Sequence, residues 1–252
     1  MASSKAVGTV AAEVLPKRSR FITTCSIDIS NLRATAEPQK YGLGFKEVWR
    51  IDSRQHHEGT VLHTQGWPLD NHTGGGGFLY HLEDNKIALG FVVHLNYRNP
   101  YLNPFEEFQR FKTHSAIKPL LQNAKRLSYG ARTINEGGVQ SLPELIFPGG
   151  ALIGCSAGFV NVPKIKGSHN AMKSGMLAAE TIIAALAHEQ FQPLLTDYPK
   201  KIRSSWLWKD IYAVRNIKPA LSAWGNIGGT LYGGADMWLH SLGITLPWTL
   251  KH

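Results

Sequence analysis

The sequence has few cysteines, few charged residues and no long apolar run. Only Cys25 and Cys155 occur among its 252 residues. Two cysteines cannot form a disulfide framework, a four-cysteine zinc site or a cysteine-ligated iron–sulfur cluster. No uninterrupted apolar stretch reaches the roughly 18–20 residues of a helix that crosses a bilayer. The sequence therefore predicts neither a disulfide-rich domain nor a conventional transmembrane protein.

Two nucleotide-binding motifs are missing as well. No Gly-x-Gly-x-x-Gly follows a strand-like segment, so a complete dinucleotide-binding βαβ unit is not expected. The glycine run at 74–77 is not followed by Gly-Lys-Ser or Gly-Lys-Thr, which excludes a phosphate-binding P-loop there. Apolar residues make up 43% of the chain and charged residues 18%, which excludes disordered and collagen-like classes. The length suits one large domain or two small ones.

Positive charge is in excess, with 27 Lys and Arg against 18 Asp and Glu. This balance suits anionic lipid, nucleic acid or an acidic protein. No nucleic-acid recognition motif accompanies it, so a nucleic-acid partner is not predicted. Residues 1–30 hold four basic and two acidic residues and resemble a mitochondrial transit segment in composition. The alternative is a leader without function, and this segment is left out of the fold prediction.

From Tyr41 onward the pattern is typical of strands, with few helices. A helix is expected at 104–112, because Asn103 is a suitable N-cap and Pro104 suits the first helical position. A nearly continuous apolar stretch at 87–93 indicates a strand that is buried on both faces. Together with a hairpin turn at 83–85, the pattern predicts a mixed sheet from strands at 41–49, 59–67, 78–82, 86–95 and 125–134.

The most unusual local feature is the run Gly74–Gly77, in which four residues without Cβ expose backbone N–H and C=O groups. One interpretation is a bare backbone wall against a flat ligand. The other, which composition favours, is a flexible turn before a strand. The histidines nearby are irregularly spaced and have no adjacent cysteine or acidic pair, so no metal site is predicted. Most of them are expected at the surface or hydrogen-bonded in the core: His56, His57, His63, His72, His81 and His94.

The strongest constellation is a short apolar strand at 151–153, a loop of small residues, and a helix that begins near Gly167 or Ser168. The N-terminus of a helix carries partial positive charge and suits an electron-rich ligand edge, such as the N1–C2=O side of a reduced flavin. The alternative is a packing joint without a ligand, and the small residues on both sides of the loop favour the ligand. Four-three spacing on the helix predicts a core-facing stripe of Met172, Met176, Ala179, Ile183 and Leu186. A second face has only small residues, which permits close backbone approach: Gly167, Ala171, Ser174 and Ala178.

Residues 149–169, GGALIGCSAGFVNVPKIKGSH, closely resemble the electron-transfer flavoprotein–ubiquinone oxidoreductases. The resemblance runs in register from about residue 32 to residue 252. It includes EPQKYG at 37–42, GWPLD at 66–70, FLYH at 78–81, NPYL at 99–102, YGAR at 129–132, NEGG at 135–138, VRNI at 214–217 and PWTLKH at 247–252.

Members of this family are monotopic membrane proteins that hold FAD and a four-iron–four-sulfur cluster. The resemblance implies electron transfer from reduced electron-transfer flavoprotein to ubiquinone, the activity of an electron-transferring-flavoprotein dehydrogenase. It implies that Gly75 and Gly76 meet the quinone head group. It also implies that a second set of residues contacts the flavin: Gly154, Cys155, Ser156, Gly158, Phe159, Pro163, Gly167 and Asn170. Within this set, Cys155 is expected to be a packing or flavin-contact residue. The resemblance implies no catalytic side chain and no metal ligand in this chain.

Two parts of the family have no counterpart here, the N-terminal dinucleotide-binding unit and the cluster domain with its four cysteines. We therefore expect the chain to correspond to the central third of a family member. The FAD site is expected to be partial, and the cluster cannot be ligated by this chain. The alternative function is a non-catalytic remnant that binds membrane or electron-transfer flavoprotein, and a weaker one is a different flavoprotein reductase.

Five of the seven tryptophans lie in the last forty-seven residues, and the stretch at 219–235 has no charged residue. Six Lys and Arg stand between residues 200 and 218. Aromatic rings beside cations indicate insertion into a membrane surface without spanning. The alternative is a glycine-rich packing face whose tryptophans fill the core. The residues predicted at the membrane are Trp206, Trp208, Trp224 and Trp238.

Taken together, these observations predict an α+β fold that lies peripherally on the mitochondrial inner membrane. An atypical leader occupies 1–30. A mixed-sheet, ubiquinone-binding-like domain occupies 31–145, and a partial FAD-binding strand–loop–helix occupies 146–190. A helical membrane-surface region occupies 191–252.

Overall fold

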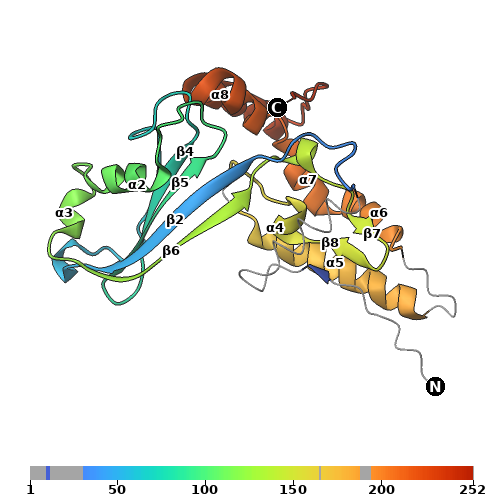
Figure 1. Ribbon diagram of the computed structural model, residues 1–252, viewed down its shortest axis with the longest axis horizontal. Coiled ribbons are helices and arrows are strands. Elements are labelled where there is room, and N and C mark those ends of the chain that lie inside the picture. The colour runs from blue at the N-terminus through green and yellow to red at the C-terminus, as the bar shows by residue number, and fades with distance from the viewer. Residues whose placement is uncertain (1–9, 12–30, 165, 188–193, 252) are drawn as a thin grey trace. The chain divides into compact units, whose positions relative to one another are not determined.

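The computed structural model describes residues 10–11, 31–164, 166–187 and 194–251, so nearly all of the expected leader lies outside the described residues. The chain divides into two compact units (Figure 1). The sheet unit contains residues 40–134 and 221–230. The helix unit contains the described parts of 1–39, 135–220 and 231–252. Each unit has its own hydrophobic core, and the architecture is mixed α/β with an antiparallel sheet.

The sheet unit is built on a five-stranded sheet in the order β3-β4-β5-β2-β6. Pairing is antiparallel between β3 and β4, β4 and β5, and β5 and β2. The β4–β5 turn has positive φ at Asp84 (58°) and Asn85 (54°), residue types that tolerate this conformation, and the predicted hairpin is confirmed. The strands are β2 (Tyr41–Arg50), β3 (Val61–Gln65), β4 (Gly75–His81), β5 (Lys86–His94) and β6 (Lys125–Asn135).

The centre of this sheet is β5, and α2 (Pro104–Lys112) packs against it. Asn103 caps α2 as expected, accepting hydrogen bonds from the N–H groups of Phe105 and Glu106. Phe108 and Phe111 of α2 are buried against β5. The unit also contains the 3-10 turn η1 (Ser53–Gln55) and the short helix α3 (Lys118–Leu121).

The helix unit surrounds a small sheet in the order β1-β8-β7, in which β1 (Val10–Ala11) is parallel to β8 (Gly150–Leu152) and β7 (Ile146–Phe147) is antiparallel to it. The tyrosine hydroxyl of Tyr198 donates to the carbonyl of Leu152 at 2.9 Å, so α6 is fixed to β8. The other elements are η2 (Val139–Ser141), α4 (Gly154–Ala157), α5 (Ser168–Ala187), α6 (Asp197–Ser204) and α7 (Trp206–Ala213).

The predicted core stripe of α5 is wrong. All five of its residues are exposed, with values between 55% and 71% for the four largest: Met172, Met176, Ala179, Ile183 and Leu186. The small-residue face lies inward instead, where Ser174 and Ala178 are buried. The hydroxyl of Ser174 accepts a hydrogen bond from the N–H of Gly154 at 2.9 Å, an approach that a larger side chain would prevent. Four-three spacing identifies a helix face, and the neighbouring segments decide which face is buried.

The last helix, α8 (Ile217–Ser241), is interrupted at Gly225, where φ is 73° and ψ is −174°. Residues 221–230 belong to the sheet unit and the two ends belong to the helix unit. Within the described part of the chain, no helix combines the length and the hydropathy that are needed to cross a bilayer.

Two of the motifs that carry the family resemblance bind each other in the helix unit. Arg215 is 4% exposed, and its guanidinium donates to the carbonyls of Leu246 and Trp248 at 2.6 and 3.2 Å. Asn216 Oδ1 accepts from the N–H of Leu250 at 2.9 Å. The VRNI motif therefore anchors residues 246–250 near the C-terminus.

Candidate functional site

The glycine run lies in the sheet unit, and three of its four residues form the start of β4 rather than a turn before it. A Cβ on Gly75 would overlap the carbonyl oxygen of Val92, and a Cβ on Gly76 would overlap that of Thr64. Gly75 also has φ of 149°. Bare backbone is therefore a packing requirement of β4. The turn interpretation is corrected, and the quinone contact at Gly75 and Gly76 stays a prediction.

Three histidines gather near the far end of β4. The ring of His81 lies 5.2 Å from that of His56 and 6.2 Å from that of His57, measured between centroids. The backbone N–H of His57 donates to Nδ1 of His81 at 3.1 Å. Burial and the two neighbouring rings lower the pKa of His81. No group of three or more ligating side chains suited to a metal ion occurs among the residues that the structure describes.

The strand–loop–helix of the helix unit runs from β8 through α4 to the start of α5. Gly154 and Gly158 have φ of 59° and 100°, a backbone region that favours glycine. A Cβ at Gly167 would lie 3.2 Å from Cys155 Sγ, so the cysteine and the glycine that precedes α5 are neighbours. Phe159 is fully buried in the core. The structure thus gathers the predicted flavin residues of this loop around the beginning of α5.

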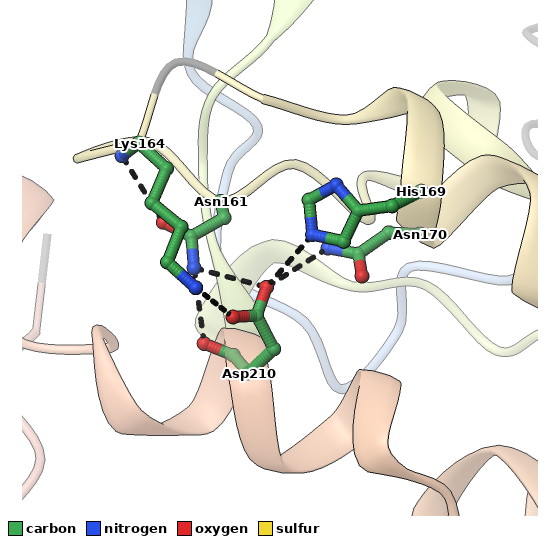
Figure 2. Close-up of polar contacts among 5 residues, drawn as sticks. All are labelled: Asn161, Lys164, His169, Asn170 and Asp210. Carbon is green, nitrogen blue, oxygen red and sulfur yellow. Dashed lines mark hydrogen bonds and ion pairs between the residues drawn. The ribbon is translucent and has the colours of Figure 1, made fainter.

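Asp210 of α7 holds this loop and this helix together (Figure 2). Its carboxylate accepts hydrogen bonds from the side chains of Asn161, Lys164, His169 and Asn170, at 3.0, 2.5, 3.3 and 3.3 Å. Burial raises the pKa of Asp210, but the four donors outweigh this effect and hold that pKa at about 2. The ring of His169 is also stacked on Trp206, with centroids 5.8 Å apart. Sequence reasoning missed Asp210, because its partners lie at least 40 residues away and no local motif marks it.

Asn170 is the clearest sign of a ligand in this region. It is 0% exposed and lies in the first turn of α5. Its Nδ2 donates to Asp210, whereas its Oδ1 has no hydrogen-bond partner and is directed away from Asp210 in Figure 2. A buried acceptor without a donor is costly, so such an atom calls for an explanation. A ligand N–H or hydroxyl at the start of α5 would satisfy it.

A buried ion pair stands at the junction of two family motifs. Lys218 Nζ lies 3.1 Å from Glu136 Oε2, and their side chains are only 3% and 4% exposed. Burial raises the pKa of Glu136 and the nearby lysine opposes that rise. The pair connects the first turn of α8 to the NEGG motif, which the sequence singled out without showing this contact.

The four predicted membrane tryptophans differ in exposure. In the helix unit Trp206 is 48% and Trp238 is 64% exposed, whereas Trp208 is partly buried against the core and stacks on Tyr212. In the sheet unit Trp224 is 48% exposed. The structure therefore gives Trp208 a packing role, and it leaves the other three available at the surface of their units.

Comparison with known proteins finds one kind of protein that resembles both units. Residues 41–134 match the family model described as ETF-QO, ubiquinone-binding. Electron transfer flavoprotein-ubiquinone oxidoreductase of Bos taurus is 55% identical over 230 residues, which are 88% of this chain and 37% of the relative. The chain is similar to electron transfer flavoprotein-ubiquinone oxidoreductase. The Arabidopsis thaliana oxidoreductase is also 55% identical, over 86% of this chain and 33% of its own length. The chain thus spans a little over one third of the curated relatives that it matches.

Solved structures share the fold at low identity. A geranylgeranyl bacteriochlorophyll reductase-like protein from Thermoplasma acidophilum has a TM-score of 0.56 and 14% identity, covering 81% of this chain and 54% of its own. The flavin-dependent brominase Bmp2 has a TM-score of 0.52 and 16% identity, covering 83% and 51%. These likenesses show a shared fold.

Proposed function

We propose that the chain takes part in electron transfer from reduced electron-transfer flavoprotein to ubiquinone, as part of an electron transfer flavoprotein-ubiquinone oxidoreductase. The observation that carries this proposal is 55% identity across 88% of the chain, which includes both units. The relatives are named mitochondrial, which supports a mitochondrial location here. The ubiquinone-binding family model covers nearly all of the sheet unit.

The residues at the start of α5 fit the ring end of a flavin. Asn170 Oδ1 is a buried acceptor without a donor, and Gly167 has no side chain beside Cys155. The residues proposed to hold the ring and its chain are Gly154, Cys155, Ser156, Gly158, Pro163, Gly167 and Asn170, with Phe159 packing beneath the loop in the core. When bound, FAD supplies the capacity to accept and pass on electrons, and the protein supplies position and electrostatics. The positive end of α5 would favour an electron-rich ring edge.

A four-iron–four-sulfur cluster does not fit this chain, because its sequence contains two cysteines and such a cluster is held by four. No step is assigned to a cluster here. The second candidate function is a non-catalytic remnant that binds membrane or electron-transfer flavoprotein without turnover, which the exposed tryptophans of α8 support.

For the quinone, we propose that the backbone at Gly75 and Gly76 meets the head group. A planar ring needs a flat surface, and backbone without Cβ atoms provides one on the face of β4. Both glycines are partly exposed although the strand around them is tightly packed. This partial exposure supports the proposal that a flat ring reaches the backbone of the two glycines.

Peripheral attachment to the inner membrane is proposed for the exposed apolar residues of α8 and the segment after it. On the sheet unit these are Trp224 and Ile227, with 48% and 69% exposure. On the helix unit Leu231, Trp238 and Leu242 are 72%, 64% and 58% exposed. Exposed tryptophan and leucine beside a basic segment are typical of helices that lie in a membrane interface.

Flavin retention by the purified full chain tests the proposal against the remnant. The chain is loaded with FAD, passed through a desalting column and examined by visible absorption, and a short-chain ubiquinone is then titrated. A flavin content near one per chain, together with quinone binding, supports the proposed function. Colourless protein that binds no quinone but still binds anionic vesicles supports the remnant and overturns the electron-transfer role.

A further inference from the structure

The interruption of α8 at Gly225 creates a second helix start inside the sheet unit. Gly225 has φ of 73°, and a Cβ there would lie 2.7 Å from both the carbonyl oxygen and the Nδ2 of Asn71. The backbone N–H groups at the beginning of a helical segment have no partners within the segment. The residues that follow Gly225 therefore need acceptors from elsewhere in the chain.

Asn71 provides those acceptors from the loop before the glycine run. Its carbonyl accepts from the N–H of Asn226 at 2.7 Å, and its Oδ1 accepts from the N–H of Ile227 at 2.9 Å. Asparagine and aspartate are favoured at helix starts because a short side-chain acceptor reaches such N–H groups. Asn71 thus caps a helical segment that lies more than 150 residues away in the sequence.

Asn226 returns the contact with its side chain. Its Nδ2 donates to the carbonyls of Asp70 and Thr73, both at 3.0 Å. Asn226 is 9% exposed and Thr73 is 2% exposed, so these hydrogen bonds are shielded from water. We call Asn71 and Asn226 the asparagine clasp. The clasp fixes a loop whose last residue, Thr73, directly precedes the glycine run.

We propose that the asparagine clasp positions the quinone site, by fixing where β4 begins and how the backbone of Gly75 and Gly76 is presented. This inference rests on the proposed function, because it concerns the quinone contact of that function. The exposed Trp224 and Ile227 lie on either side of Gly225 and Asn226, so the clasp joins the proposed membrane-facing residues to the quinone loop. Neither asparagine touches the quinone in this account, and both act through the backbone that they hold.

The clasp makes opposite demands on its two members. At position 71 both contacts are accepted by oxygen, so aspartate preserves them and adds negative charge at a helix start, where it is favourable. At position 226 the side chain must donate to two carbonyls, so aspartate removes the donor and directs a carboxylate at them. Asn71→Asp and Asn226→Asp are therefore the same chemical change with opposite expected results.

The experiment titrates decylubiquinone into the full chain in detergent micelles and measures the Kd for each variant. We expect Asn226→Asp to weaken the Kd by about tenfold or more, which corresponds to about 1.4 kcal/mol of binding free energy. Asn71→Asp is expected to stay within about twofold of the parent chain, whereas Asn71→Ala weakens the Kd by about threefold to tenfold. Ser222→Ala is the matched control, because it removes one exposed hydrogen bond, from Asn96, to the part of α8 that precedes Gly225.

The flavin content of the helix unit is measured for every variant. A variant that affects only the quinone loop keeps the flavin content of the parent chain, whereas a variant that unfolds the protein loses flavin. If Asn226→Asp is too unstable to titrate, the Kd values of Asn71→Ala and Asn71→Asp are compared instead. The inference then predicts weaker quinone binding for Asn71→Ala than for Asn71→Asp. Wild-type affinity in Asn226→Asp or in Asn71→Ala overturns the inference alone. Absence of quinone binding by the parent chain overturns the proposed function and the inference with it.

Discussion

Replacing Asp210 by alanine tests the arrangement around the proposed flavin loop. The carboxylate accepts from four side chains, and two of these, Asn161 and Asn170, are 0% exposed. Asn170 Nδ2 would be left without an acceptor, whereas Asn161 Nδ2 keeps the backbone carbonyl of residue 210 at 3.2 Å. A buried donor without an acceptor costs about 1–3 kcal/mol, so Asp210→Ala should lower the free energy of unfolding by about 1–3 kcal/mol. The side chains of Lys164 and His169 are 52% and 39% exposed and can turn to water. They add little, about 0–1 kcal/mol.

Urea unfolding followed by far-ultraviolet circular dichroism measures this loss. Asp197→Ala is the matched control, because the Asp197–Lys200 pair is 66% and 75% exposed. Exposed pairs of this kind are worth about 0–1 kcal/mol. If Asp210→Ala and Asp197→Ala destabilise the chain equally, the claim that Asp210 holds the loop to α5 is refuted.

The pH dependence of Asp210 gives a second check on the same residue. Its pKa falls from the usual 3.8 to about 2 in the folded chain. A carboxyl whose pKa is lowered by folding contributes stability above its unfolded pKa, and that contribution is lost as pH falls through the folded pKa. The stability difference between the parent chain and Asp210→Ala should therefore be constant above about pH 5 and should shrink between about pH 4 and pH 2. A difference that grows on acidification contradicts the assignment.

Three further changes probe other parts of the account. Lys218→Met removes the cation from beside the buried carboxylate of Glu136 and should cost about 3–5 kcal/mol in urea unfolding, with recovery when Glu136→Gln is added; a cost under about 1 kcal/mol contradicts the ion pair. Gly76→Val places its Cβ on a carbonyl oxygen of the neighbouring strand, so limited proteolysis should show loss of the folded sheet unit, and a protease-resistant variant argues against that packing. Trp238→Ser should weaken binding to anionic vesicles about fivefold, whereas Trp208→Ser should lower stability instead, and the reverse pattern contradicts the proposed membrane surface.

Features with local signals were predictable from the sequence. Asn103 and Pro104 fixed the start of α2, and Asp84 and Asn85 marked the β4–β5 turn through their tolerance of positive φ. The start of α5 was likewise as expected, at Ser168. Each of these signals depends on residues a few positions apart in the chain.

Features that depend on distant partners were not predictable. The prediction of the buried face of α5 was wrong, because the segments that pack against a helix, and not the spacing of its apolar residues, decide which face is buried. Ser174 lies on the inward face, where its hydroxyl accepts a hydrogen bond from the N–H of Gly154. Asp210 and Asn226 carried no motif at all, since their contacts cross 40 to 156 residues. The glycine run was recognised as unusual, but its packing against Thr64 and Val92 was invisible without the strand register.

The central claim, that bare backbone at Gly75 and Gly76 meets a quinone head group, is tested most directly by nuclear magnetic resonance of the full chain labelled with ¹⁵N-glycine. Decylubiquinone is added stepwise in detergent micelles. The account predicts that the amide signals of Gly75 and Gly76 shift with saturation while those of Gly59 and Gly130, which stand in open space, do not. Saturable quinone binding that leaves the signals of Gly75 and Gly76 unmoved would contradict it.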